Sequence, residues 1–204
     1  MPSPGVLIVE GSTDLQFVKH LAAHYDIPDQ LFTIKAGNSD SGALEAFSLT
    51  VKARSHSAIG LVIDADTNAA KAFGRAIGNL TNLGYKGLPK RPPSDGWIKR
   101  QAGLPALGIW VMPNNKDGGK LEDLAGYMIG AQDALWPHAL DILRALPDTR
   151  FKKADEIKAR LHSWLAWQKE PGLTIGAAVW LKYLNPNCQE AKVFANWLQQ
   201  LFGK

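Results

Sequence analysis

Short runs of apolar residues recur along the first half of the chain, and turn residues bound each of them. Segments 6–9, 59–63 and 107–112 are almost entirely branched and apolar, which is typical of strands buried on both faces of a parallel sheet. Segment 31–35 is rich in β-branched and aromatic residues and predicts another strand, and 97–99 is a possible short one.

Between these runs the apolar positions recur every three or four residues, which predicts helices. The first covers residues 13–25, where Thr13 and Gln16 stand at the spacing of a capping box. A second follows residues 36–42. A third follows the turn at Asp64 and Asp66 and ends near Gly84, with Phe73, Ile77, Leu80 and Leu83 on its apolar face. This strand–helix alternation implies right-handed crossovers and an α/β fold with a parallel sheet.

The pattern changes near residue 132, after which helices are expected at about 133–146, 153–168, 174–184 and 189–202. We therefore predict an α/β core over residues 1–130 and a helical extension over 131–204, packed together as one unit. Five tryptophans at helical spacing are expected to lie in the core: Trp136, Trp164, Trp167, Trp180 and Trp197.

Composition narrows the class of protein only moderately. The 204 residues are 46% hydrophobic and 21% charged, as in an ordinary globular protein, and the lone Cys188 excludes an internal disulfide. No apolar stretch is long enough to span a bilayer, and residues 1–4 do not begin like a signal peptide, so we expect a cytoplasmic protein without membrane contact. A net charge of +4 permits nucleic-acid binding without requiring it.

Acidic residues follow two of the predicted strands directly. Asp64 and Asp66 end the run 59–63, while Glu10 ends the run 6–9 and Asp14 lies in the first turn of the next helix. The carboxyl ends of parallel strands meet at one rim of a sheet, where α/β folds place ligands. Carboxylates this close repel one another unless a cation or a shared proton relieves them, and Mg²⁺ prefers such oxygen ligands. The alternative is that these acids only cap helices.

Further candidates follow the strand 107–112. Lys116 and Lys120 lie in its polar loop, and Glu122 and Asp123 begin a helix, where they are possible additional acids of the site. The glycine- and serine-containing loop 36–42 could hold a phosphate or be an ordinary connection. A basic segment could grip a nucleic-acid backbone or be a solvated face; its members are Lys86, Lys90, Arg91, Lys99 and Arg100.

The stretch Glu10-Gly11-Ser12-Thr13-Asp14, followed by Asp64-Ala65-Asp66, resembles the Toprim domain of topoisomerases, primases and the overcoming-lysogenization-defect nucleases. Segments 108–115, 119–123 and 164–172 extend the resemblance to a family of small standalone Toprim-like bacterial proteins. It implies a Toprim-like, Rossmann-like sheet of about four parallel strands with helices on both faces.

The same resemblance implies roles for particular residues. Glu10 corresponds to a general acid/base or metal ligand, Asp64 and Asp66 to magnesium ligands, and Asp14 to an acid that joins the metal site in the nuclease branch. A later lysine that assists at the phosphate corresponds to Lys116 or Lys120.

Three functions are compatible with these features. The first is magnesium-dependent phosphodiester chemistry on DNA or RNA, as a Toprim-type nuclease, with Mn²⁺ as a substitute metal. The second is a metal-dependent module that binds a nucleotide or nucleic acid without cutting it, for example in phage defence. The third is a scaffold in which the acids are only caps. A homodimer or a partner protein is compatible with each.

Overall fold

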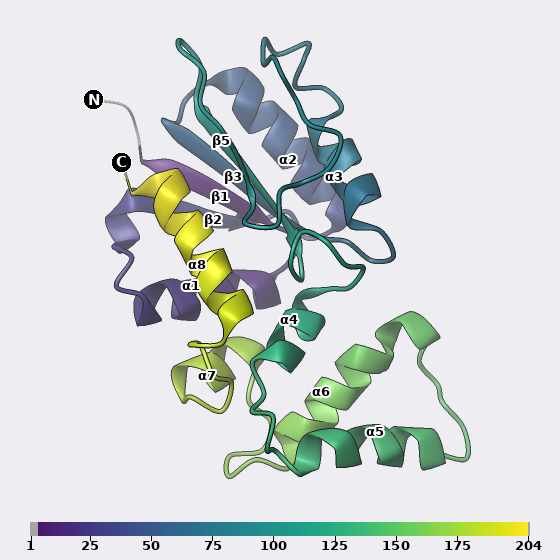
Figure 1. Cartoon of the computed structure of the whole chain (residues 1–204). Coiled ribbons are helices and arrows are strands. Elements are labelled where there is room, and N and C mark those ends of the chain that lie inside the picture. The colour runs from purple at the N-terminus through teal and green to yellow at the C-terminus, as the bar shows by residue number, and fades with distance from the viewer. Residues whose placement is uncertain (1–3, 204) are drawn as a thin grey trace.

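A computed structural model describes residues 4–203 of the chain. Residues 1–3, on which the expected lack of a signal peptide partly rests, lie outside this range. Five strands form one sheet in the order β2-β1-β3-β5-β4 (Figure 1). They are β1 (Gly5–Val9), β2 (Phe32–Ala36), β3 (Ala58–Asp64), β4 (Trp97–Lys99) and β5 (Ala106–Met112).

Four of these strands are parallel, as the sequence predicts, and the edge strand β4 runs antiparallel to β5. The α/β class and the mostly parallel sheet are thus confirmed, with one antiparallel strand added. Eight α-helices in the described residues surround the sheet: α1 (Ser12–His24), α2 (Asp40–Ala53), α3 (Ala69–Ile77), α4 (Leu121–Tyr127), α5 (Leu135–Ala145), α6 (Glu156–Ala166), α7 (Ile175–Trp180) and α8 (Gln189–Phe202). Short 3₁₀ turns cover Asp29–Leu31 and Lys153–Asp155.

Successive side chains of each strand point to opposite faces of the sheet, and helices cover both faces. Val6, Ile8 and their neighbours on β3 and β5 pack against α2 and α3. Leu7, Val62 and Trp110 face the other way, toward α1 and α8. Both faces are therefore buried, which explains why the strands carry unbroken apolar runs.

The helix α8 lies close to the sheet because two glycines oppose each other beneath it. Gly60 on β3 pairs in register with Gly108 on β5. A Cβ atom added to Gly108 would stand 2.4 Å from Cδ2 of Leu201, and one added to Gly60 would be 3.1 Å from the same atom. This pair of glycines leaves the room into which α8 packs (Figure 1).

Three local predictions are wrong. The helix expected to reach Gly84 ends at Ile77, because Gly78 follows and turn bonds such as Leu80 N–H to Ile77 O continue the chain. The helix expected over 174–184 is α7 alone, and Lys182 adopts a positive φ of 62° just after it. At α1 the carboxylate of Asp14, rather than a Thr13–Gln16 box, caps the helix by accepting the Gly11 N–H at 3.0 Å.

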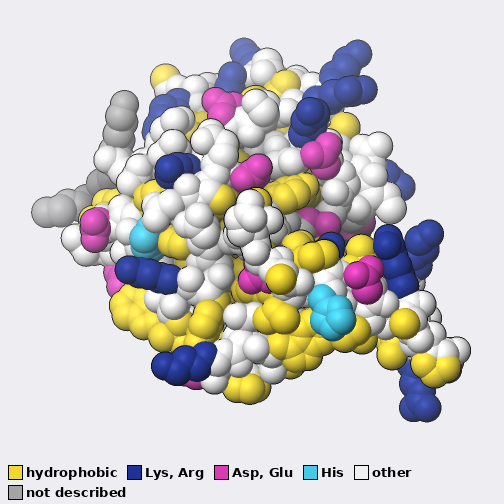
Figure 2. Space-filling model, turned by 60° about the horizontal axis from the view of Figure 1, so that its bottom comes forward, with side chains coloured by type: hydrophobic (Ala, Val, Ile, Leu, Met, Phe, Trp, Pro, Cys, Tyr) yellow, Lys and Arg dark blue, Asp and Glu magenta, His cyan; other side chains and the backbone are white. Residues whose placement is uncertain are grey.

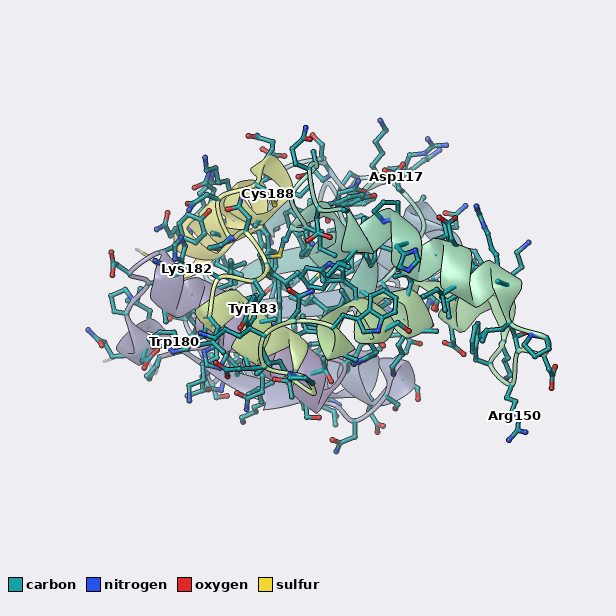
Figure 3. The ribbon with its side chains drawn as sticks, turned by 90° about the horizontal axis from the view of Figure 1, so that it is seen from below. Asp117, Arg150, Trp180, Lys182, Tyr183 and Cys188 are labelled. Carbon is teal, nitrogen blue, oxygen red and sulfur yellow. The ribbon has the colours of Figure 1, made fainter. Side chains whose placement is uncertain are left out.

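The helices after residue 131 lie in three places. Helix α8 packs on the sheet, α7 packs along α1, and α5 and α6 form a hairpin that contacts the rest of the molecule through α4 (Figure 1). Viewed from below, Trp180, Lys182 and Tyr183 lie around α7, whereas Arg150 lies at the far tip of the hairpin (Figure 3).

The tryptophan prediction holds only in part. Trp164 and Trp197 are buried, but Trp180 ends the short helix α7 and is 63% exposed. The lower surface, toward the viewer in Figure 2, carries several patches of hydrophobic side chains. None of the helices in residues 4–203 has the length and apolar character needed to cross a bilayer.

Candidate functional site: an acid cleft at the rim of the sheet

The carboxyl ends of β1 and β3 and the amino end of α4 meet around a cleft of about 300 Å³. We call this the acid cleft. Five carboxylates line it, Glu10, Asp14, Asp64, Glu122 and Asp155, together with Lys120 and Lys158. The first four acids come from the end of β1, the first turn of α1, the end of β3 and the first turn of α4. The parallel sheet thus brings together acids that are more than 100 residues apart in the chain.

Backbone amides hold the two acids that end the strands. The N–H of Asp64 donates to Oε1 of Glu10 at 2.7 Å, which ties the end of β1 to the end of β3. Oδ1 of Asp64 accepts the N–H of Leu121, the first residue of α4, at 3.2 Å. Both carboxylates are therefore fixed relative to the sheet.

Burial and mutual repulsion disfavour the charged forms of these acids. Burial, followed by the negative charges of Glu10, Asp14 and Glu122, raises the pKa of Asp64 to about 9. Burial raises the pKa of Asp14 to about 6, with the Gly11 N–H and the charge of Lys158 acting in the opposite direction. Burial also raises the pKa of Glu10. Nearby positive charge would relieve this repulsion.

The two additional acids on α4 have different surroundings. Glu122 is only 8% exposed and lines the acid cleft. Asp123 instead caps its own helix, because its Oδ2 accepts the N–H of Lys120 at 2.8 Å. Asp123 lines a neighbouring cleft and not the acid cleft.

Asp66 does not face the acid cleft as Asp64 does. It takes a left-handed backbone conformation with φ of 50°, and its N–H donates to Gly119 O at 3.0 Å. Its carboxylate lies 3.6 Å from Nζ of Lys120 and its side chain is 58% exposed. The expectation that Asp64 and Asp66 turn into one crevice therefore fails in this arrangement, because the tight turn at Asp66 directs its side chain elsewhere.

The structure separates the two candidate lysines. Lys120 lines the acid cleft, and its Nζ is 3.6 Å from both Asp66 Oδ1 and Asp155 Oδ1. Burial alone would lower the pKa of Lys120, but Asp66, Asp155 and the acids of the cleft outweigh it and raise the pKa. Lys116 is exposed and lines a different cleft with Arg91.

Two residues of the acid cleft come from the helical hairpin and were not among the candidate catalytic residues. Asp155 precedes α6 and pairs with Lys120, and Lys158 lies in the first turns of α6. Lys158 belongs to a basic group in the sequence, Lys152, Lys153, Lys158 and Arg160, but nothing in that group indicates which lysine faces the acids. Contact between α4 and α6 determines it.

The loop 36–42 also reaches the cleft. Asn38 and Ser39 line it, and Ser39 caps α2 by accepting the Gly42 N–H at 3.0 Å. The loop is tightly closed, since a Cβ atom on Gly37 would stand 2.3 Å from the Ala43 nitrogen. Phosphate binding by this loop stays a prediction.

Most of the basic segment lies away from this rim. Lys99 pairs with Leu107 near the start of β5, and Arg100 Nη2 donates to Gln200 O on α8. The N–H of Lys86 donates to Gln101 Oε1, next to the same end of the sheet. Lys90 is exposed in the connecting loop. Of the five basic residues, Arg91 lines a cleft that also contains residues of the loops after β3 and β5.

The donor set of the acid cleft fits a hard divalent cation, because it consists of carboxylate oxygens. However, among residues 4–203 no three His, Cys, Asp or Glu side chains stand together as a ready-made metal-binding group. Binding of Mg²⁺ or Mn²⁺ therefore requires some of these carboxylates to turn toward the ion.

Comparison with known proteins places the chain in a family. The model of one family matches residues 4–203. The chain belongs to that family, described as a protein of unknown function (DUF3226). No curated protein matches this DUF3226 sequence. Among solved structures, the DUF3226 chain is similar to the C-terminal region of the Burkholderia pseudomallei OLD protein, with a TM-score of 0.52 and 12% identity over 97% of this chain and 98% of that chain. At this identity the likeness concerns the fold.

Proposed function

We propose that this protein is a metal-dependent nuclease of the Toprim type, which hydrolyses phosphodiester bonds of nucleic acid in the acid cleft. The observation that carries the proposal is the convergence of Glu10, Asp14, Asp64 and Glu122 on one cleft beside two lysines. OLD abbreviates overcoming lysogenization defect, the nuclease group whose Toprim domain the sequence resembles. The shared fold supports the proposal without carrying it.

The carboxylates would hold Mg²⁺, or Mn²⁺ in its place. Glu10 and Asp64 are the first ligands, because backbone hydrogen bonds already position both. Asp14 and Glu122 line the same cleft and are the further ligands. Asp66 joins them only when its side chain leaves Lys120. The cation, when bound, supplies an activated water and stabilises charge on the leaving oxygen.

The lysines would act on the phosphate. Lys120 and Lys158 approach the acid cleft from α4 and from α6, so a phosphate between them meets positive charge from both. A scissile phosphate carries negative charge into a cleft that is already acidic, and the two ammonium groups offset that repulsion. If Glu10 does not hold the cation, its pKa, raised by burial, suits it to exchange a proton with water or with the leaving oxygen instead.

The proposal is tested by incubating the whole chain with single-stranded DNA, duplex DNA and RNA in the presence of Mg²⁺ or Mn²⁺. We expect cleavage that EDTA abolishes and that is lost in Asp64→Asn and Glu10→Gln. Asp148→Asn is the matched control. It changes an exposed acid that follows α5 and does not line the acid cleft, and the variant should cleave as the wild type does. Undiminished cleavage by Asp64→Asn would exclude the acid cleft as the reaction centre.

One observation favours a second function, the binding of nucleic acid or a nucleotide without cleavage. Lys120 is already paired with Asp66 and Asp155, which leaves less of its charge for a reacting phosphate. If the protein only binds, the nucleic acid or nucleotide binds in the presence of Mg²⁺ or Mn²⁺ and is recovered intact. Asp155→Asn then shows no cleavage, as the wild type does. If the protein is a nuclease, Asp155→Asn changes a cleavage rate that the wild type already shows.

A further inference from the structure

A second cleft, of about 330 Å³, lies at the same rim of the sheet and differs from the acid cleft in charge. Three segments line it: the turn after β3, the loop around residues 91–94 and the loop after β5. We call it the cationic cleft. Its charged side chains are Arg91 and Lys116, and its polar ones are Thr67, Asn68, Ser94 and Asn115.

Both cations of this cleft are available to a ligand. Within residues 4–203, neither Arg91 nor Lys116 has a carboxylate within 4.0 Å in an ion pair. Lys120, in contrast, is paired twice, and Arg75 is paired with Asp40. Two unpaired cations beside polar side chains form a surface suited to phosphate oxygens.

The walls of the cationic cleft are held in place from below. Asn115 is 3% exposed, and its Oδ1 accepts the N–H of Val111 at 2.8 Å. Its Nδ2 donates to Ser94 O at 3.5 Å, so one buried side chain connects the end of β5 to the loop that carries Arg91.

The third wall is connected just as closely. A Cβ atom on Gly118 would stand 3.0 Å from the carbonyl oxygens of Asp66 and Thr67, so the loop that carries Lys116 lies directly on the turn after β3. Asn68 caps α3 by accepting the Lys71 N–H at 2.9 Å, which places the amino end of α3 at the cleft. The positive end of that helix adds to the two cations.

A third hollow lies between the cationic cleft and the acid cleft, because it shares lining residues with each. Thr67 and Gly118 line the cationic cleft and also the hollow that contains Asp66 and Lys120. Lys120 in turn lines the acid cleft. A chain of phosphates leaving the acid cleft past Lys120 would cross this hollow, which Lys153 and three carboxylates also line, and would then reach Arg91 and Lys116.

We propose that the cationic cleft binds backbone phosphates of a polynucleotide strand that continues beyond the bond held in the acid cleft, an inference that rests on the proposed function. The ligand is a polynucleotide and not a mononucleotide, because the two clefts are distinct hollows and a single nucleotide in one leaves the other without a phosphate. Recognition is by charge and independent of base sequence.

The test measures binding rather than cleavage. The whole chain in EDTA is titrated into a labelled single-stranded oligonucleotide of about 20 nucleotides, which exceeds the ~4–16 nucleotides that one binding fold covers. Fluorescence anisotropy at several salt concentrations gives the Kd and its salt dependence. The variants are Arg91→Ala/Lys116→Ala and the charge-preserving Arg91→Lys/Lys116→Arg.

The matched control is Lys19→Ala/Lys52→Ala, which removes the same charge from exposed positions on α1 and α2. We expect Arg91→Ala/Lys116→Ala to weaken binding on the order of tenfold. The slope of log K against log salt should fall by about 1.4, the value for two lost contacts to a single strand. The control should change the Kd less than about twofold, and the charge-preserving pair should keep the slope.

Equal weakening by the control, or an unchanged Kd in Arg91→Ala/Lys116→Ala, overturns the proposal. So does an oligonucleotide that does not bind. If ATP or pyrophosphate loses affinity in the double variant while the oligonucleotide does not, the ligand is a free nucleotide and the polynucleotide assignment is wrong. If the wild type cleaves nucleic acid but Arg91→Ala/Lys116→Ala binds the oligonucleotide as tightly as the wild type, this inference alone is wrong. If the double variant binds more weakly but the wild type cleaves nothing, the nuclease proposal alone is wrong.

Discussion

Replacing Asp64 by asparagine should make the metal-free protein more stable, although most substitutions of buried polar residues destabilise. Asparagine keeps the oxygen that accepts the Leu121 N–H, and the bond from the Asp64 N–H to Glu10 belongs to the backbone. The substitution therefore removes the ionisable group and little else. What it removes is a carboxyl group whose charged form is disfavoured by burial and by four neighbouring acids.

The size of the effect follows from the pKa of Asp64, which burial and the neighbouring acids raise from its ordinary value of 3.8 to about 9 in the folded protein. At pH 7 the Asp64 carboxyl is ionised in the unfolded chain, whereas in the folded protein it must keep its proton or carry a buried charge. Keeping the proton at pH 7 costs about 1.4 kcal/mol for each pH unit above the ordinary pKa of 3.8, and pH 7 lies about three units above it. The upper limit is therefore about 4 kcal/mol.

We expect a gain of about 2–4 kcal/mol at pH 7, since Glu10 and Asp14 share the repulsion. In a domain of this size the melting temperature should rise by about 4–16 °C. Thermal unfolding followed by circular dichroism, in EDTA, measures it. Asp148→Asn is the control and should change stability by less than about 0.5 kcal/mol.

The pH dependence has a definite sign. Because the folded pKa of Asp64 is raised, the folded protein binds this proton more tightly, and the wild type loses stability as the pH rises from about 4 to about 9. The advantage of Asp64→Asn should disappear as the pH falls toward 4 and level off above 9. An equal or lower stability of the variant at pH 7, or a difference independent of pH, would refute the reasoning.

Three further predictions concern the cation, Lys120 and the loop before β4. Mn²⁺ at about 100 times its Kd should stabilise the wild type by about 2.7 kcal/mol in thermal unfolding and leave Asp64→Asn unchanged; an equal shift in both proteins would place the ion elsewhere. Lys120→Ala should lower kcat for cleavage by on the order of 100-fold, while Lys52→Ala, at the end of α2, should not; similar rates in both variants would remove Lys120 from the reaction. Gly96→Ala should lower the free energy of unfolding by about 1–3 kcal/mol more than Gly103→Ala, as measured by denaturant titration. Both glycines have a positive φ, but only at Gly96 would a Cβ atom meet the Trp197 ring, at 2.3 Å. Equal losses would mean that the ring moves aside freely.

The sequence predicts the strands well because the physical cause is local. A strand covered on both faces needs apolar side chains in both directions, and segment 59–63 is accordingly an unbroken apolar run. The sequence predicts too long a third helix for a related reason. Leu80 is buried, so it fits the apolar pattern, but turns after Gly78 place it in the core instead of a longer helix.

The candidate site could be predicted only as far as the sheet determines it. Glu10 and Asp64 meet because adjacent parallel strands end at the same rim, which is a consequence of topology. The direction of Asp66 depends on a single left-handed residue and its bond to Gly119, and a one-residue spacing between two acids does not reveal it. Asp155 and Lys158 reach the cleft through packing of α6 on α4, for which the sequence holds no local signal.

The position of α8 on the sheet has a consequence for how the chain folds during synthesis. The surface of β3 and β5 that Phe194, Trp197 and Leu201 cover is complete once residue 112 has been made, yet its cover arrives about 80 residues later. At ~5–20 residues per second, that apolar surface stays open to water for roughly 4–16 seconds on the ribosome. Until α8 has been made, the nascent sheet can use this apolar surface for contacts that α8 replaces in the folded protein.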